Sequence, residues 1–263
     1  MNWSGKDHSW VVCAYGESVY LEECVQSLAG QTVKSRIQIS TATPNDHIRS
    51  IAARYGLKLI VNQGKPGIGS DWNFALENGE TEWLTIAHQD DLYEPGYTEA
   101  MLRKVNRCRR PILFFSDYAE LRDGKKVETN KILKIKRMLL MPVRLFPGQR
   151  WARRLSLSFG DPICCPAVTY RKSVMKGIRF SESMIVSLDW EMMERLSRLK
   201  GGFAFDPGRL MCHRIHRESA TTELISDHTR TREDYEMMRK FWPEKIARKL
   251  SKAYSESEKS NSV

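Results

Sequence analysis

This chain of 263 residues lacks the sequence features of a secreted protein, of a protein with a structural zinc site and of a membrane-spanning protein. Its six cysteines form no CxxC pair and follow no zinc-ligand spacing. We therefore predict reduced, mostly buried thiols rather than a disulfide framework. The N-terminus MNWSGKDHSW has no apolar segment of the kind that a signal peptide needs. No apolar run approaches the roughly 20 residues that cross a bilayer, so we predict a cytoplasmic protein.

Internal repeats, a low-complexity linker and the phosphate loop GxxxxGK[ST] are also missing. The glycine-rich stretch NQGKPGIGS at 62–70 does not have the phosphate-loop spacing, and we interpret it as a connecting loop. Positive charge, by contrast, is in excess: 42 Lys and Arg face 32 Asp and Glu, with a net charge of +10 and a pI of about 9.3. This balance favours a negatively charged partner, such as a nucleic acid, a phosphorylated substrate or an anionic membrane surface.

Short apolar runs alternate with helical patterns through the first half of the chain. Strands are predicted at 10–14, 37–41, 57–61, 83–87 and 112–116, and helices at 17–29, 43–56, 69–78 and 95–108. A hairpin is expected at RDGKK, and two later helices at 187–199 and 229–241. The alternation predicts an α/β fold with a mostly parallel sheet and helices on both faces.

The fourth predicted strand is followed directly by polar and acidic residues, in the stretch TIAHQDDLYEP at 85–95. Asp90 and Asp91 repel each other, and a cation between them would relieve that repulsion. Ligands on parallel sheets bind at the carboxyl ends of the strands, where this pair is expected. Such carboxylates suit Mg²⁺ or Mn²⁺ together with the oxygens of a substrate diphosphate. An acidic pair ahead of Pro95 can also cap a helix, so the pair alone leaves both interpretations open.

Further motifs accompany this pair in a definite order. They are VCAYGESVYLEECVQSLAGQT at 12–32, GSDWNFAL at 69–76, SLDWE at 187–191, and an R-x-H…S-x-T pattern at Arg214, His216, Ser219 and Thr221. With HQDDLYEP they resemble, over residues 9–222, the family 2 glycosyltransferases, which are inverting enzymes of the GT-A fold. The resemblance implies a GT-A-like, Rossmann-related sheet with C-terminal acceptor-side helices.

The resemblance also implies an organisation and an activity. A glycosyltransferase domain would span 1–222, with a nucleotide-sugar-binding half at 1–117 and an acceptor-side half at 118–222, followed by a basic helical extension at 223–263. The enzyme would move a sugar from a nucleotide diphosphate sugar, with UDP-sugar favoured, to a hydroxyl of a glycan or lipid-linked glycan, with inversion. Such transfer would serve cell-surface polysaccharide or glycan assembly, and no nucleic acid is expected as a partner.

Individual residues receive roles from the same resemblance. Asp189 would be the catalytic base, and Asp90, Asp91 and His216 would hold Mn²⁺ or Mg²⁺. The donor would be bound by Ala14, Tyr15, Glu17, Thr41, Thr43, Asn73, His88, Gln89 and Arg214. This chain departs from the family where the second strand normally ends in two aspartates that hold uracil and ribose. Thr41 and Ala42 stand there instead, so the base need not be uracil.

Alternatives stand beside these assignments. Asp189 lies in the first turn of a predicted helix, where the helix dipole stabilises an acid without any catalysis. A sugar-phosphate nucleotidyltransferase would use a similar sheet, but CAYGESVYLEE lacks the glycine-rich, basic loop of those enzymes. A basic nucleic-acid-binding protein fits the charge, although the basic residues follow no recognised binding motif.

Basic and apolar residues are mixed between 131 and 157. The basic residues are Lys131, Lys134, Lys136, Arg137, Arg144, Arg150, Arg153 and Arg154, and the apolar ones include Ile132, Leu133, Ile135, Leu139, Leu140 and Leu145. Such a segment without a span suits peripheral binding to anionic lipid, which would place the protein at the inner face of a membrane. A solvated face packed on the core is the alternative.

Overall fold

The computed structural model describes residues 2–65, 67–216 and 229–259, which are built around one nine-stranded sheet. The strand order is β3 (Lys58–Val61), β2 (Arg36–Thr41), β1 (His8–Ala14), β4 (Trp83–His88), β8 (Val168–Arg171), β6 (Pro111–Arg122), β9 (Gly202–Ile215) and β5 (Leu92–Tyr93), and β7 (Lys125–Val127) pairs with β6. Strands β5, β7 and β8 run antiparallel to their neighbours, and the others run in one direction. The predicted mostly parallel α/β sheet is confirmed.

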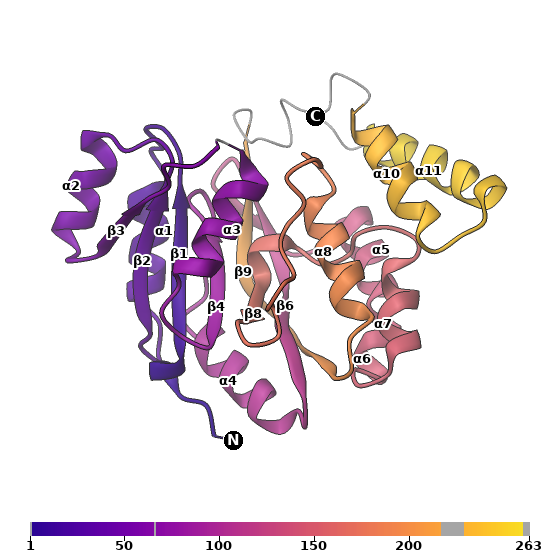
Figure 1. The fold of residues 1–263 in the computed structure, drawn as a ribbon, viewed down its shortest axis with the longest axis horizontal. Coiled ribbons are helices and arrows are strands. Elements are labelled where there is room, and N and C mark those ends of the chain that lie inside the picture. Colours follow the sequence, from indigo (N-terminus) through magenta and orange to yellow (C-terminus); the bar gives the residue numbers. More distant parts are fainter. Residues whose placement is uncertain (1, 66, 217–228, 260–263) are drawn as a thin grey trace.

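Helices cover both faces of the sheet (Figure 1). One face packs against α1 (Leu21–Ala29), α2 (Asp46–Arg54) and α4 (Tyr97–Arg107), and the other against α3 (Ile68–Asn78), α7 (Arg150–Leu157) and α8 (Leu188–Ser197). Alternation along β1 produces this division, because successive strand residues point to opposite faces. Val11 enters the core beside α3 and α8, whereas Trp10 and Val12 enter the core beside α1 and α4.

Two helices begin three or four residues later than the sequence pattern predicts. The helix expected from residue 17 begins at Leu21, because the preceding residues form a loop in which Gly16 has a left-handed φ of 61°. A residue with a side chain rarely adopts that conformation. The helix expected from residue 43 begins at Asp46, since the side chain of Asn45 accepts a hydrogen bond from the main-chain N–H of Ile48 at 2.8 Å and caps the helix.

Two other expectations agree with the structure. The hairpin at RDGKK joins β6 to β7, with Asp123 and Gly124 both at positive φ, as a tight hairpin turn requires. All six cysteines are free, and each is buried or half-buried.

The segment from 131 to 157 folds into three short helices, α5 (Lys131–Leu139), α6 (Met141–Leu145) and α7. Helices α10 (Thr229–Arg239) and α11 (Glu244–Lys259) lie beside α8 (Figure 1) and bury Met237, Met238 and Ala247 in the same core. The domain boundary expected at 222–223, like Ser219 and Thr221, lies outside the described residues. Among the described helices, none combines the length and the hydropathy that crossing a bilayer requires.

Candidate active site

A cleft of about 730 Å³ opens at the carboxyl ends of β1, β2 and β4. The N-terminus of α8, the end of β9 and the helices α5, α10 and α11 complete its walls. Eight residues with a role predicted from the sequence line it, namely Ala14, Tyr15, Thr41, His88, Gln89, Asp90, Asp189 and His216. The fold therefore brings residues from four separate strand ends and one helix to a single cavity.

Asp90 lies two residues after the end of β4 and faces histidines from two elements. Its Oδ2 lies 2.9 Å from Nε2 of His216, which follows the end of β9. Burial opposes ionisation of Asp90, but the neighbouring imidazoles of His88 and His216 lower its pKa below the usual value. Asp90 is therefore a carboxylate at neutral pH.

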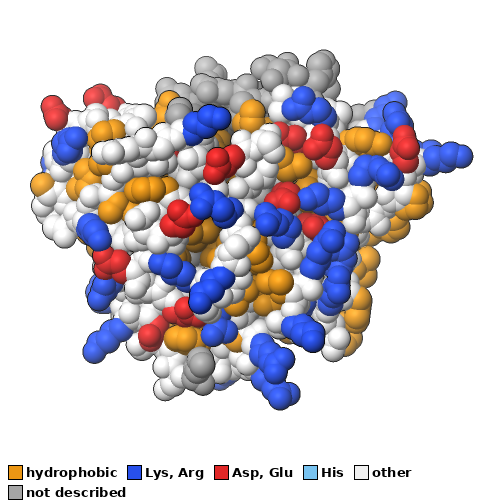
Figure 2. All heavy atoms as spheres, in the orientation of Figure 1, with side chains coloured by type: hydrophobic (Ala, Val, Ile, Leu, Met, Phe, Trp, Pro, Cys, Tyr) orange, Lys and Arg blue, Asp and Glu red, His pale blue; other side chains and the backbone are white. Residues whose placement is uncertain are grey.

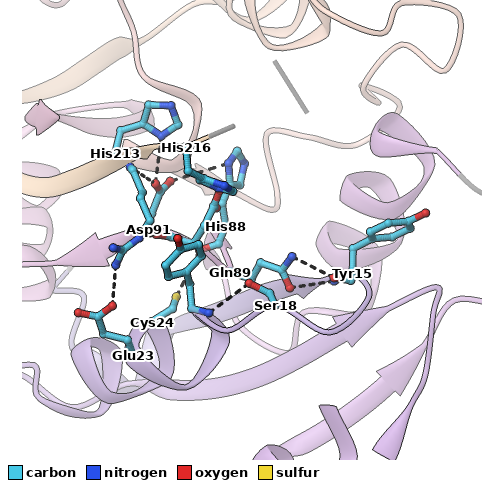
Figure 3. A network of polar contacts seen from close by, with 12 residues as sticks. Tyr15, Ser18, Glu23, Cys24, His88, Gln89, Asp91, His213 and His216 are labelled. Carbon is cyan, nitrogen blue, oxygen red and sulfur yellow. Dashed lines mark hydrogen bonds and ion pairs between the residues drawn. The ribbon is translucent and has the colours of Figure 1, made fainter. Parts of the chain in front are cut away.

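Asp91 is fully buried behind Asp90 and ties β4 to β9 (Figure 3). Its Oδ1 accepts a hydrogen bond from the main-chain N–H of Arg214 at 2.8 Å and lies 3.0 Å from Nδ1 of His213. Burial opposes protonation of His213, but the Asp91 carboxylate raises its pKa. No role was predicted for His213 from the sequence. Its partner Asp91 is 122 positions away in the chain, and the residues next to His213 do not indicate this contact.

The group formed by His88, Asp90 and Asp91 fits a divalent cation. One potential ligand atom from each lies within 4.8 Å of the others. Asp91 Oδ2 and His88 Nε2 are buried without a hydrogen-bond partner among the described residues. Such buried polar atoms are costly unless a ligand satisfies them. Two carboxylates and an imidazole are suitable ligands for Mn²⁺ or Mg²⁺.

Arg214 lies beneath this group and does not line the cleft. Its Nε donates to the main-chain carbonyl of Asp90 at 2.7 Å, and its Nη2 donates to Glu23 at 2.6 Å. The guanidinium also packs over the ring of Tyr20, 4.3 Å from its centre. Its hydrogen bonds are therefore directed at α1 and at the turn that presents Asp90, rather than at the cavity where a diphosphate would bind.

Gln89 joins the ends of β1 and β4 (Figure 3). Its side-chain amide accepts from the main-chain N–H of Tyr15 and donates to the Tyr15 carbonyl, both at 3.0 Å. The Tyr15 side chain itself is exposed. Nearby, the Thr43 hydroxyl accepts from the main-chain N–H of Gly16 at 2.8 Å, and the Thr41 hydroxyl accepts from the N–H of Thr43 at 3.0 Å. These contacts shape the rim of the cleft from main-chain atoms.

Two further residues predicted to bind the donor, Glu17 and Asn73, also lie outside the cleft lining. Glu17 is exposed outside the cleft lining. Asn73 is buried in α3, where its Oδ1 accepts from the main-chain N–H of Phe180 at 2.7 Å and its Nδ2 donates to the Phe180 carbonyl at 3.0 Å. The Asn73 amide therefore holds the loop that leads to α8. Trp72, its neighbour, lines the cleft and stacks on His88 with ring centres 5.2 Å apart.

Asp189 lines the cleft from the first turn of α8, and its Oδ1 accepts from the main-chain N–H of Trp190 at 2.8 Å. Burial raises the pKa of Asp189. Asp161 lines the same region, and burial together with the Asp189 carboxylate raises its pKa well above the usual value. Asp161 was not predicted from the sequence, although an acid in the apolar stretch GDPICCP was an available signal. Lys136 was predicted to lie on a basic surface, but it lines the cleft.

Helix α10 holds the chain that leads into α8. The Glu233 carboxylate is buried and accepts from the main-chain N–H groups of 185–187 at 2.8–2.9 Å. The neighbouring Asp234 accepts from the Ser187 hydroxyl at 3.0 Å. The C-terminal helices thus support the same end of α8 that carries Asp189 into the cleft.

Comparison with known sequences agrees with this site. The family model described as glycosyl transferase family 2 matches residues 9–176, which is more than half of the chain. The chain belongs to glycosyl transferase family 2. It is therefore a transferase that acts on glycosyl groups, and the order of motifs along the sequence had indicated this family.

Several similar curated proteins are uncharacterized glycosyltransferases of Rickettsia. An uncharacterized glycosyltransferase of Rickettsia typhi is 24% identical over 223 residues, which cover 83% of this chain and 67% of that protein. Another, from Rickettsia conorii, is also 24% identical and is matched over 84% of this chain but only 36% of its own length. The chain thus spans about a third of the length of that longer relative.

Two solved structures confirm the GT-A-like fold. TarS 1–349 of S. aureus in complex with UDP-GlcNAc superposes with a TM-score of 0.64 at 17% identity, over 93% of this chain and 70% of that chain. The mannosyltransferase PcManGT from Pyrobaculum calidifontis in complex with GDP-Man and Mn²⁺ has a TM-score of 0.64 at 11% identity, over 98% and 76%. At these identities the likeness concerns the fold.

Proposed function

We propose that this glycosyltransferase moves a sugar from a nucleotide diphosphate sugar to an acceptor hydroxyl with inversion of the anomeric carbon. The observation that carries the proposal is that the carboxylate of Asp90 and the carboxylate of Asp189 line one cleft while coming from opposite halves of the chain. An inverting displacement needs a site for the leaving diphosphate and a separate base for the attacking hydroxyl. The cleft supplies a candidate for each.

The donor side is assigned to the strand ends. Ala14 and Thr41 line the cleft at the ends of β1 and β2, where a nucleoside would bind in a sheet of this kind. A UDP-sugar is the favoured donor, and support comes from the similar fold of TarS, which was solved with UDP-GlcNAc. GDP-mannose, which accompanies PcManGT, is the next donor to test.

Mn²⁺ or Mg²⁺ is the proposed cofactor, held by Asp90 and Asp91 with His88. When bound, such an ion neutralises charge that develops on a leaving diphosphate. His216 is assigned to Asp90, which it contacts at 2.9 Å, and thereby to the orientation of that carboxylate. Arg214 and Gln89 would keep the loop between β4 and β5 in the conformation that presents these groups.

Asp189 is the proposed general base. A carboxylate within about 2.6–3.2 Å of the acceptor hydroxyl can take its proton as the hydroxyl attacks. The pKa of Asp189, raised by burial, makes this carboxylate a stronger base than an exposed aspartate. Lys136 and Asp161 also border this side of the cleft, where they could bind polar groups of the acceptor.

A glycan or lipid-linked glycan is the proposed acceptor, and cell-surface polysaccharide or glycan assembly in the cytoplasm, at the inner face of a membrane, is the proposed setting. The main enzymatic alternative is a sugar-phosphate nucleotidyltransferase on a similar sheet, and membership of family 2 favours glycosyl transfer over it. Binding of nucleic acid is not part of the proposal, because acidic side chains stand at the centre of the cleft.

A panel of UDP-, GDP-, CDP- and dTDP-sugars tests the proposal. One donor should raise the unfolding temperature when Mn²⁺ is present and, at high enzyme concentration, should release its nucleoside diphosphate to water faster than the freed sugar mutarotates. The configuration of the freed sugar, followed by NMR before mutarotation, should be opposite to that of the donor. A sugar freed with retained configuration would contradict inversion. Pyrophosphate released from a nucleoside triphosphate and a sugar phosphate would identify a nucleotidyltransferase instead.

A further inference from the structure

Helices α5, α6 and α7, with the residue that follows α6, leave seven large apolar side chains exposed to solvent. Met138, Leu145 and Trp151 are 64%, 62% and 53% exposed. The complete group, which we name the α5–α7 surface, comprises the apolar residues Ile135, Met138, Met141, Leu145, Phe146, Trp151 and Leu155 and the exposed cations Lys131, Lys134, Arg144 and Arg150. Single exposed apolar residues are ordinary, but a group of this size indicates a binding surface.

The charge of this surface has one sign. Residues 131–157 contain eight Lys and Arg and no Asp or Glu. In Figure 2, apolar side chains gather along the lower right-hand edge, in the region of α5–α7, with Lys and Arg side chains next to them. A surface with both exposed aromatic residues and unopposed positive charge is complementary to the headgroups and outer acyl chains of an anionic bilayer.

Other cations of the same segment are used inside the protein. Arg137 is paired with Asp117 at 2.6 Å, and Arg154 with Glu194 at 2.6 Å. Arg153 is buried and donates to several main-chain carbonyls, including those of Leu199 at 2.8 Å and Ser197 at 3.1 Å. These contacts fasten α7 to the end of α8. The exposed side chains are therefore presented on a rigid support rather than on a loose segment.

Helix α5 connects this surface to the cleft. Lys136 lines the cleft, with its ammonium 5.6 Å from the centre of the Tyr118 ring. Lys134 and Met138, two residues away on either side, are exposed. One face of a single helix thus belongs to the cleft that contains Asp189, and another face belongs to the α5–α7 surface.

We propose that the α5–α7 surface binds an anionic lipid bilayer, with Leu145, Phe146 and Trp151 entering the interface and Lys131, Lys134 and Arg144 contacting headgroup phosphates. The rings of Phe146 and Trp151 pack together at 5.3 Å, which presents one aromatic wedge. This inference rests on the proposed function only for its purpose, namely to bring the acceptor side of the cleft to a lipid-linked acceptor. The binding itself requires neither donor nor acceptor.

The experiment is co-sedimentation of the full chain with vesicles of phosphatidylcholine alone, or with about one third phosphatidylglycerol. Binding is expected on the anionic vesicles and should weaken as salt is raised. The variant Lys131→Gln/Lys134→Gln/Arg144→Gln should bind about a hundredfold more weakly, since each cation near such a surface contributes roughly a factor of five. The control Arg107→Gln/Arg109→Gln/Lys125→Gln, which removes equal charge elsewhere, should lose far less.

The apolar contribution is tested with Leu145→Gln/Trp151→Gln. This variant should bind at least about tenfold more weakly, because two large side chains no longer leave water. Val19→Gln/Ile246→Gln, which alters two other exposed apolar residues, should bind as the wild type does. Tryptophan fluorescence should shift to shorter wavelength on anionic vesicles, and Trp151→Phe should remove most of that shift.

Three outcomes would overturn the inference. The wild type could fail to bind anionic vesicles at low salt, or both control variants could lose as much as their test partners. Alternatively, sedimentation velocity could show a dimer that Leu145→Gln/Trp151→Gln dissociates, without vesicle binding, which would assign the surface to a second copy of the chain. Metal-dependent donor binding, measured on the same variants without lipid, separates each outcome from a failure of the proposed function.

Discussion

Arg214 donates a hydrogen bond from Nε to the main-chain carbonyl of Asp90 at 2.7 Å, although the two residues are 124 positions apart in the chain. The same guanidinium bonds Glu23 in α1 at 2.6 Å. One side chain from the end of β9 therefore links α1 to the turn after β4. This relationship makes Arg214 a support for the candidate metal site, where the sequence motif had indicated a contact with the donor diphosphate.

We expect Arg214→Lys to weaken Mn²⁺ binding by about tenfold, the lower end of the effect of losing a group that orients metal ligands. Lysine keeps the positive charge, but its single ammonium group cannot donate to the Asp90 carbonyl and to Glu23 at once as the planar guanidinium does. Titration calorimetry with Mn²⁺ alone measures the change. Glu23→Gln should act in the same direction with a smaller effect. Unchanged Mn²⁺ affinity together with weaker donor affinity would assign Arg214 to the diphosphate after all.

Asp90→Asn should impair donor binding, whereas Asp189→Asn should impair turnover. The first should abolish metal-dependent donor binding, because a neutral amide is a poor ligand for a hard cation. The second should preserve donor and metal binding while turnover falls on the order of a hundredfold or more, as expected for a lost general base. Donor affinity from calorimetry and turnover from nucleotide release distinguish them. Wild-type turnover in Asp189→Asn would identify the residue as a helix cap and leave Glu191 as the next candidate base.

The pH dependence of turnover should also report Asp189. Its pKa is raised by burial, so the base becomes protonated, and inactive, at a higher pH than an ordinary aspartate would. The rate should therefore fall on the acidic side with a midpoint above about 4, the usual pKa of an aspartate. The turnover rate should be measured at saturating donor, because the pH dependence of donor affinity reports the carboxylates at the strand ends instead. A rate that stays constant down to the usual aspartate pKa would exclude this assignment.

Glu233→Gln tests whether α10 positions the end of α8. An amide is neutral and offers one acceptor oxygen to the three main-chain N–H groups of 185–187, so all three donors lose a charged partner and at least one loses its acceptor. We expect a loss of about 1–3 kcal/mol in the free energy of unfolding, together with slower turnover at unchanged donor affinity. Glu236→Gln is a matched control, because Glu236 is exposed on the same helix. Equal effects from both variants would contradict a specific role.

Asn73→Ala should destabilise the fold without changing donor affinity. The substitution leaves the N–H and carbonyl of Phe180 without the side chain that bonds both, at a cost of about 2–4 kcal/mol for two buried groups. Denaturant unfolding measures the cost, with Asn78→Ala, at the exposed end of the same helix, as control. A stable variant with weak donor binding would instead support the role that the family motif implied.

His8 should make the fold sensitive to acid. It is fully buried between the hydroxyls of Ser35 and Thr85, and burial lowers its pKa to about 3. Because the folded pKa lies below the unfolded value of about 6.5, the neutral ring contributes full stability above pH 6.5. That contribution is lost as the pH falls toward 3, by roughly 1.4 kcal/mol per pH unit. In urea unfolding, His8→Gln should show a shallower loss between about pH 6.5 and pH 4, and an unchanged slope would refute the assignment.

The sequence alone was sufficient for the class of fold and for the position of the principal carboxylates. Periodicity is local, so apolar runs alternating with amphipathic helices reveal the strands and the two-sided cover of the sheet. The ends of those strands then locate Asp90 and Thr41 at the edge where ligands bind. The spacing of motifs along the chain also indicated the family, because each motif occupies a fixed place in the order of elements.

Only the tertiary structure decided which predicted residues face the cleft. Arg214 and Asn73 carry the same functional groups as ligand-binding residues, but their partners, Asp90 and Phe180, are more than a hundred positions away. Local patterns contain no information about such pairs, since strand order and helix packing create them. The segment 131–157 makes the same point, because its cations look alike in sequence. Packing of α7 against α8 buries Arg153 and leaves Arg150 in solvent, and only that packing distinguishes a structural arginine from a surface one.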